Sequence, residues 1–253
     1  MNLFDMHCHL DFMENAGGAA ERAQALGIGC YSVTVTPHDY ERVSREFAAH
    51  ENVRVGLGLH PWWIADGSCG EEDIDRFGVL AAETRFIGEV GLDFGKRCAG
   101  TEELQTAAFE RIASACSQGG KVVSLHAVKA VGAVLDVLEQ FSCLEGNACI
   151  LHWFSGTSDE LQRAIRMGCY FSVGPRMLAA KRGVEYVKAI PASRLLLETD
   201  APPESGSTMP YDEIAQQLRE TLERIERLRG DGVAEEIAGA SKELLFSRAC
   251  SVG

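Results

Sequence analysis

Two kinds of hydrophobic pattern alternate along this chain. Short apolar runs rich in β-branched residues predict buried strands, and segments in which apolar residues recur every three to four positions predict amphipathic helices. The expected strands cover residues 3–9, 29–36, 53–60, 86–92, 122–126, 148–152, 170–173 and 195–200. The expected helices cover residues 17–27, 39–50, 71–84, 101–119, 131–141, 158–168 and 183–190, and after the last strand 211–229 and 233–246.

Eight strands that alternate with helices predict a (β/α)8 TIM barrel, and strand runs almost free of charge suit a parallel sheet buried on both faces. Ser158 is expected to cap one helix, and Gly27, Gly119 and Gly168 stand where helices should stop. A doubly wound open sheet is the structural alternative. Because no Pro/Gly/Ser-rich linker and no internal repeat divides the chain, residues 1–253 are expected to form a single domain.

The composition of the chain limits the class of protein and the cellular compartment that we expect. The chain has 253 residues, 46% of them hydrophobic, which is ample for a core. No apolar run approaches the ~18–20 residues of a membrane helix, and no signal peptide precedes the first strand. The nine cysteines are scattered without a Cys-x-x-Cys pair, so neither a disulfide framework nor a cysteine zinc site is indicated. We therefore expect a cytoplasmic protein without a membrane partner.

The net charge of −13 limits the kinds of partner. It argues against a general nucleic-acid coat protein, because affinity for phosphate backbones comes from Lys and Arg. It does not exclude an enzyme that holds phosphodiesters through metal ions.

The first expected strand carries two histidines separated by one residue. His7 and His9 point to the same face of a strand, whereas Cys8 points away from it. Two strand rises of ~3.3 Å place the imidazoles about 7 Å apart, so both can bind one metal ion. The alternative is a pair of histidines with ordinary hydrogen bonds, and the other strand ends decide between the two.

Polar residues also stand at the ends of the other expected strands, where a barrel enzyme has its active site. Five of the seven histidines lie there, and two carboxylates interrupt apolar strands, which is costly unless a cation meets them. These residues are His7, His9, His60, His126, His152, Glu89 and Asp200. Without His60, the set supplies the four imidazoles and two carboxylates that two divalent ions need if one carboxylate bridges. Such ligands suit Zn, Mn, Fe or Co, and also Mg at the carboxylate-rich position.

Five short segments carry a resemblance to a known family. They are Asp5-Met6-His7-Cys8-His9-Leu10, Gly58-Leu59-His60-Pro61, Ile87-Gly88-Glu89-Val90-Gly91-Leu92-Asp93, His152-Trp153-Phe154-Ser155-Gly156 and Leu197-Glu198-Thr199-Asp200-Ala201-Pro202. In content, order and spacing they resemble the motifs of the TatD family of metal-dependent hydrolases and deoxyribonucleases, within the amidohydrolase superfamily. The similarity extends from residue 3 to about residue 202.

The resemblance implies a role for each residue of the set. The implied metal ligands are His7, His9 and Asp200 for one ion, His126 and His152 for the other, and Glu89 between the two. His60 would lie near the scissile phosphate without binding metal, and Asp200 would also orient or deprotonate the nucleophilic water. The implied activity is hydrolysis of phosphodiester bonds in DNA.

Two departures from the family pattern concern the substrate. Where the family usually has Ser-Arg after the strand-five histidine, this chain has Ala127 and Val128. Where the loop after strand eight usually carries Arg-Asn-x-Pro, this chain has Ser-Thr-Met-Pro at 207–210. Arg176 and Lys181 are candidates to replace the missing cations. A small molecule with an amide, ester or lactone bond is the alternative substrate, and a binding protein with a degenerate site is the third hypothesis.

Four residues near the motifs have a predicted position or role. Trp62 and Trp63 follow His60 at the top of the barrel, where they either stack on a base or pack under a loop. Trp153 is expected to face away from the site and pack against helices. Asp93 is expected to orient one of the ligands.

Overall fold

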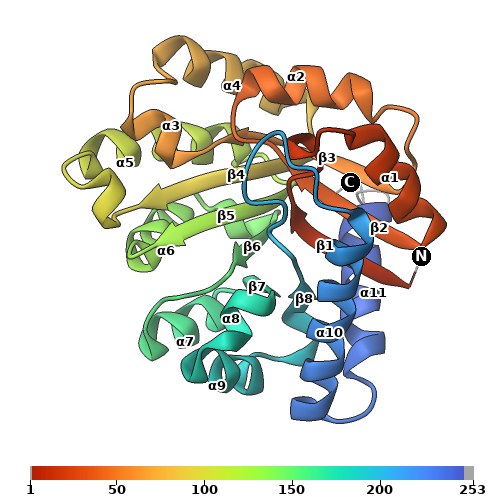
Figure 1. Cartoon of the computed structure of the whole chain (residues 1–253). Coiled ribbons are helices and arrows are strands. Elements are labelled where there is room, and N and C mark those ends of the chain that lie inside the picture. The colour runs from red at the N-terminus through yellow and green to blue at the C-terminus, as the bar shows by residue number, and fades with distance from the viewer. Residues whose placement is uncertain (1, 248–253) are drawn as a thin grey trace.

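A computed structural model describes residues 2–247 of the chain. Eight parallel strands, hydrogen-bonded in sequence order, form the inner layer, and helices surround them (Figure 1). The strands are β1 (Leu3–Cys8), β2 (Ile28–Val33), β3 (Val53–Leu59), β4 (Phe86–Asp93), β5 (Val122–Val128), β6 (Ala148–His152), β7 (Tyr170–Val173) and β8 (Leu195–Leu197). This arrangement confirms the predicted (β/α)8 barrel.

The helices form the outer layer of the barrel. They are α1 (Ala16–Ala25), α2 (Pro37–Glu46), α3 (Pro61–Ala65), α4 (Glu71–Glu83), α5 (Glu102–Cys116), α6 (Val131–Gln140), α7 (Ser158–Arg166), α8 (Pro175–Ala179), α9 (Lys181–Ala189), α10 (Tyr211–Arg229) and α11 (Val233–Phe246). Four short 3-10 turns lie among them, at Leu10–Phe12, Lys96–Cys98, Cys143–Glu145 and Ala192–Arg194.

Two short helices at the top of the barrel were missed by the pattern of hydrophobic residues. Both α3 and α8 begin with a proline directly after a strand, at Pro61 and Pro175. Proline is favoured at the first helical position because its fixed φ suits the helix and its missing N–H is not needed there. The two dipeptides His60-Pro61 and Gly174-Pro175 were therefore the available signal.

Several predicted boundaries differ from the structure by a few residues, and two of these differences have a clear cause. Thr157, and not Ser158, caps α7: its hydroxyl accepts the N–H of Glu160, whose carboxylate in turn accepts the N–H of Thr157. The eighth strand ends at Leu197 instead of residue 200, because Asp200 takes a left-handed backbone conformation with φ of 53°.

The seam between the first and last strands lies beside the strand-end histidines. The His7 carbonyl accepts the N–H of Asp200 at 2.9 Å, and the Ala201 carbonyl accepts the N–H of His9 at 2.9 Å. The buried Asp5 carboxylate accepts both the N–H and the hydroxyl of Thr199, at 3.0 and 2.5 Å. These bonds hold the upper ends of β1 and β8 together.

One glycine lets β4 approach its neighbour closely. A Cβ atom on Gly91, which has φ of 139°, would lie 2.1 Å from the His126 carbonyl oxygen. No other residue fits this position without moving the backbone. The close approach brings Glu89 on β4 and His126 on β5 into one cluster.

At the lower end of the barrel, two buried polar side chains donate hydrogen bonds to backbone carbonyls. The hydroxyl of the fully buried Tyr31 donates to the carbonyls of Ile87 and Val122. The buried Lys121 donates to the carbonyls of Ala81 and Thr84, at the C-terminus of α4, at 2.6 and 2.8 Å. These contacts fix the lower ends of β4 and β5, away from the strand-end histidines.

Three features of the chain can be stated only as far as the described residues extend. A single domain over residues 1–253 stays a prediction, and residues 1 and 248–253 lie outside the described residues. Within residues 2–247, none of the helices has the length and apolar character needed to span a membrane. The eight cysteines in this part of the chain are all buried and free.

Candidate metal centre

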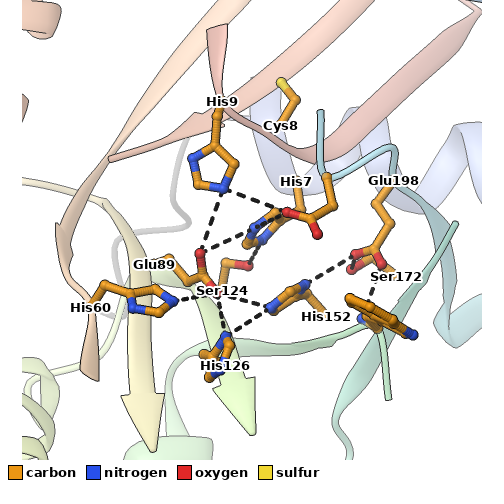
Figure 2. A network of polar contacts seen from close by, with 12 residues as sticks. His7, Cys8, His9, His60, Glu89, Ser124, His126, His152, Ser172 and Glu198 are labelled. Atoms are coloured by element: carbon orange, nitrogen blue, oxygen red, sulfur yellow. Dashed lines mark hydrogen bonds and ion pairs between the residues drawn. The ribbon is translucent and has the colours of Figure 1, made fainter. Parts of the chain in front are cut away.

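The structure brings the predicted strand-end residues into one cluster at the C-terminal end of the barrel. Figure 2 shows six of them, with Glu89 among the histidine rings and the sulfur of Cys8 turned away. The six predicted metal ligands and His60 are almost entirely buried, apart from Asp200, whose side chain is 17% exposed. The members of the cluster are His7, His9, His60, Glu89, His126, His152 and Asp200.

The carboxylate of Glu89 lies between two groups of histidines. Its Oε2 atom is 3.5 Å from His7 Nε2 and 3.6 Å from His9 Nε2. Its Oε1 atom is 2.7 Å from His126 Nδ1 and 2.9 Å from His152 Nε2. One oxygen therefore serves the β1 pair of histidines and the other serves the β5 and β6 pair.

Asp200 completes the half of the cluster formed by β1. Its Oδ1 atom lies 3.7 Å from His7 Nε2 and 3.5 Å from His9 Nε2. Its Oδ2 atom accepts a hydrogen bond from Arg176 Nη1 at 2.8 Å. The two oxygens of Asp200 thus face different groups, the histidine pair on one side and the Arg176 guanidinium on the other.

Neighbouring polar groups fix the orientation of two rings, and a third ring lies near a buried carboxylate. His7 Nδ1 is 2.7 Å from the Ser124 hydroxyl, which leaves Nε2 facing the two carboxylates. His126 Nε2 is 3.2 Å from Asp93 Oδ2, which leaves Nδ1 facing Glu89. His152 Nδ1 has no hydrogen-bond partner within residues 2–247 and lies 3.8 Å from Glu198 Oε2, and its Nε2 faces Glu89.

Asp93 has the orienting position that the sequence predicts, whereas Ser124 and Glu198 were not anticipated. Asp93 also accepts the indole N–H of Trp62 at 2.6 Å and the N–H of Gly95 at 2.7 Å. Glu198 accepts the hydroxyl of Ser172 and the N–H of Trp153. Like Glu89, these buried polar residues interrupt or end apolar strands, which was the signal available in the sequence.

His60 is held as a neutral hydrogen-bond donor. Its Nδ1 accepts the N–H of Trp62 at 3.1 Å, so the ring proton stands on Nε2, 3.3 Å from Glu89 Oε1. Burial lowers the pKa of His60 to about 4, so the ring is uncharged at neutral pH.

The histidines keep the two central carboxylates ionised. Burial acts to raise the pKa of Glu89, but the charges of the surrounding histidines outweigh burial and hold it well below its usual value. Burial likewise opposes ionisation of Asp200, whereas contact with His9 and nearby histidine charge lower its pKa to about 2. The cluster therefore offers two anionic carboxylates at neutral pH.

The chemistry of these donors fits divalent metal ions. Three groups have ligand atoms within 4.8 Å of one another: His7–His9–Glu89, His7–His152–Asp200 and His60–Glu89–His126. The buried His7 Nε2 atom has no hydrogen-bond partner within residues 2–247. A buried nitrogen left unpaired is costly, and a metal ion is a partner that this nitrogen can take.

A cavity of about 330 Å³ opens above the cluster. Most of its wall is apolar or aromatic, formed by Phe12, Val35, Trp62, Trp63, Ala127, Val128 and Trp153. Arg176 is the one Lys or Arg among its described lining residues. The predicted alternative cation, Lys181, is exposed at the start of α9 and does not line the cavity.

The prediction for Trp153 was wrong. Its side chain lines the cavity and is 39% exposed, instead of packing against helices. The expectation extended the alternation of β6 by one residue, but β6 ends at His152 and Trp153 has φ of 40°. The left-handed turn brings the indole to the mouth of the cavity.

Comparison with known proteins finds relatives of this chain. The family model described as "TatD related DNase" matches residues 4–245. The "3'-5' ssDNA/RNA exonuclease TatD" of Enterobacter lignolyticus is 31% identical over 208 residues, 79% of each chain. The protein of the same description from Escherichia fergusonii is 27% identical over 245 residues, 92% of this chain and 93% of the relative.

Solved structures show the same fold. A TatD homolog from Escherichia coli superposes with a TM-score of 0.80 at 23% identity, over 97% of this chain and 98% of the homolog. A TatD family hydrolase from Entamoeba histolytica superposes with a TM-score of 0.77 at 15% identity, over 96% and 98%.

Proposed function

Because this chain belongs to the TatD-related DNase family of hydrolases, we propose that it is a metal-dependent nuclease that cleaves phosphodiester bonds in DNA. Relatives described as exonucleases on single-stranded DNA and RNA support a nucleic-acid substrate. The observation that carries the proposal is the position of Glu89, whose two carboxylate oxygens face two separate pairs of histidines. A carboxylate in this position suits a centre with two divalent ions.

The proposed ligands divide into two sets. They would be His7, His9 and Asp200 for one ion, His126 and His152 for the other, and Glu89 for both. Histidine and carboxylate ligands suit Zn, Mn or Co, and Mg is the alternative at the carboxylate-rich position. When bound, such ions supply Lewis-acid chemistry, which stabilises charge on phosphoryl oxygens and makes water easier to deprotonate.

Asp200 is the proposed general base. Its pKa of about 2 keeps it ionised, so it can take a proton from the water that attacks phosphorus. Its position at the seam, between the β1 histidines and the cavity, places the carboxylate at the edge of the space that a substrate would fill.

His60 is proposed to bind the substrate and not a metal ion. Because its Nδ1 accepts a backbone N–H, its Nε2–H is a donor directed into the cluster. A neutral donor there can bind a phosphoryl oxygen and stabilise the charge that grows on it during attack.

A hydrolase of amide, ester or lactone bonds in a small molecule is the second candidate. The mainly apolar wall of the cavity supports it, because Ala127 and Val128 stand where a cation would assist a nucleic-acid backbone. The net charge of −13 supports it too, since it disfavours the approach of a polyanion.

We also propose that the protein works in the cytoplasm. Eight free, buried cysteines within residues 2–247 suit a compartment that keeps thiols reduced.

Cleavage of fluorescent single-stranded DNA by the metal-loaded protein tests the nuclease proposal. Metal content is measured in the same preparation, and Asp200→Asn and Glu89→Ala serve as inactive controls. We expect cleavage by the wild type that both substitutions abolish. Metal-loaded protein that cleaves neither DNA nor RNA nor a model phosphodiester would remove the proposal, and hydrolysis in an ester and lactone screen would then favour the second candidate.

A further inference from the structure

One guanidinium lies at the mouth of the cavity above the cluster. Arg176 is in α8, directly after β7, and its side chain is 46% exposed. It is the one Lys or Arg among the described residues that line this cavity. The proline at the start of α8 gives its backbone a fixed position at the end of the strand.

Two contacts hold the Arg176 side chain over the cluster. Its Nη1 donates to Asp200 Oδ2 at 2.8 Å, and its Cζ lies 5.1 Å from the ring centroid of Trp153. An arginine has five N–H donors, and this side chain makes no other hydrogen bond within residues 2–247. Donors therefore remain for an anion bound in the cavity.

The backbone of Trp153, whose ring lies under Arg176, is held by a hydrogen bond of its own. The N–H of Trp153 donates to Glu198 Oε1 at 3.0 Å, in the left-handed turn that ends β6. Glu198 is buried and also accepts the hydroxyl of Ser172 on β7, beside His152 (Figure 2). Arg176 thus lies over the indole of a residue whose backbone is bonded to the buried Glu198.

The other described residues that line the cavity include no Lys or Arg, so the charge of Arg176 matters for the binding of an anion. Glu89 and Asp200 contribute negative charge to the floor, and the β5 side of the wall is formed by Ala127 and Val128. Among the described Lys and Arg residues, Arg176 on the β7 side is the one whose guanidinium or ammonium an entering anion can meet in this cavity. A neutral ester offers this guanidinium only an uncharged acceptor, whereas a phosphodiester offers an anionic oxygen and forms a stronger hydrogen bond between two charged groups.

We propose that Arg176 is the residue that makes this site select anionic over neutral substrates. Its free N–H groups bind a non-bridging oxygen of the substrate phosphate, while the aromatic wall takes the apolar part of the substrate. The inference rests on the proposed phosphodiesterase function for its kinetic test, and on anion binding alone for its second test.

The kinetic test compares two substrates that differ in one charge. Bis(p-nitrophenyl) phosphate is an anion, and its methyl ester is neutral with the same leaving group. For Arg176→Ala we expect kcat/KM on the diester to fall about 10- to 100-fold, mainly through KM, because a hydrogen bond to a charged group is lost. Hydrolysis of the neutral ester should fall about 10-fold less than that of the diester, because the ester loses only the contact of Arg176 with Asp200. Arg176→Lys should recover part of the loss on the diester.

The matched control is another arginine stacked on an aromatic ring. Arg194 lies 4.5 Å from the ring centroid of Tyr170, at the start of β7, and does not line the cavity. Arg194→Ala removes the same charge from the protein without changing the site, so both substrates should be hydrolysed as by the wild type. Equal losses on both substrates for Arg176→Ala, or no loss on the diester, would overturn the proposal.

A binding measurement separates this inference from the nuclease proposal. Calorimetric titration of metal-loaded protein with thymidine 5'-monophosphate, at matched metal content, needs no turnover. We expect binding about 10-fold weaker in Arg176→Ala and unchanged in Arg194→Ala. If the wild type cleaves no phosphodiester but shows this difference, the nuclease proposal fails and the role of Arg176 stands. Equal binding by wild type and Arg176→Ala, or no binding by the wild type, removes that role.

Discussion

The indole N–H of Trp62 donates to Asp93 Oδ2 at 2.6 Å, and the same oxygen lies 3.2 Å from His126 Nε2. A residue of the cavity wall is therefore joined, through one carboxylate, to a candidate metal ligand. Arg97 covers the Trp62 ring at 3.9 Å and helps to fix the indole. The position of Trp62 and the orientation of His126 are thus coupled.

Trp62→Phe tests this coupling, because it keeps a ring in the wall but removes the N–H donor. Asp93 then loses one of the bonds that orient it towards His126. We expect the affinity for divalent metal to fall about 10-fold, as when other orienting partners of ligands are lost. Competition with a chromophoric chelator measures the change. Trp63→Phe is the control, since the Trp63 indole N–H has no hydrogen-bond partner within residues 2–247, and an equal effect of both changes would argue against the coupling.

Glu89→Asp tests whether one carboxylate serves both halves of the cluster. The substitution keeps the charge but shortens the side chain, so the two oxygens can no longer reach both histidine pairs. Elemental analysis should show about one bound divalent ion per chain instead of about two, if the centre holds two. Hydrolysis should fall about 100-fold or more because the reacting groups are misplaced. Full metal content with full activity would contradict the assignment.

Lys121→Met is expected to destabilise the fold without altering the site. The ammonium donates to two carbonyls at the end of α4, and Met fills the same space without donating. We expect the free energy of unfolding to fall by about 2 kcal/mol, because two carbonyls lose a charged donor. Urea denaturation measures the loss. Lys188→Met removes an exposed ion pair with Glu185 and should cost less than about 0.5 kcal/mol.

The N-terminus of α7 offers a matched pair of neighbouring substitutions. Thr157→Ala removes the cap and should lower the free energy of unfolding by about 1 kcal/mol. Ser158→Ala changes the first helical residue, whose side chain makes no capping bond in the structure, and should stay within about 0.5 kcal/mol of the wild type. Thermal or urea unfolding of both variants decides which residue caps the helix, and a larger loss for Ser158→Ala would contradict the structure.

The barrel and its polar cluster could be predicted because each depends on a short-range pattern. Buried parallel strands are read from apolar runs, and in a barrel their ends converge, so His7, Glu89 and His152 could be placed together without coordinates. Glu89 stood out because a carboxylate within an apolar strand needs a partner. Ser124 interrupts an apolar run in the same way, but a hydroxyl costs less to bury and gives a weaker signal.

The contacts of Trp153 and Arg176 could not be predicted in this way. The alternation of side chains holds only while the strand continues, and the turn after His152 reverses the expected direction of Trp153. The bond between Arg176 and Asp200 joins the start of α8 to the segment after β8, and the two meet only when β8 lies beside β7. The pattern of residues within one segment does not predict a contact between two separate segments.

The seam between β1 and β8 has a consequence for how the protein is made. Asp5 and Thr199, which are hydrogen-bonded across the seam, are separated by 194 residues in the sequence. The proposed ligands His7 and Asp200 also lie on opposite sides of the seam. During synthesis from the N-terminus, the histidine pair leaves the ribosome first and Asp200 leaves long afterwards. The complete centre can therefore assemble only after nearly the whole barrel has been translated, so full occupancy by metal would report that the last strand has reached its place beside the first.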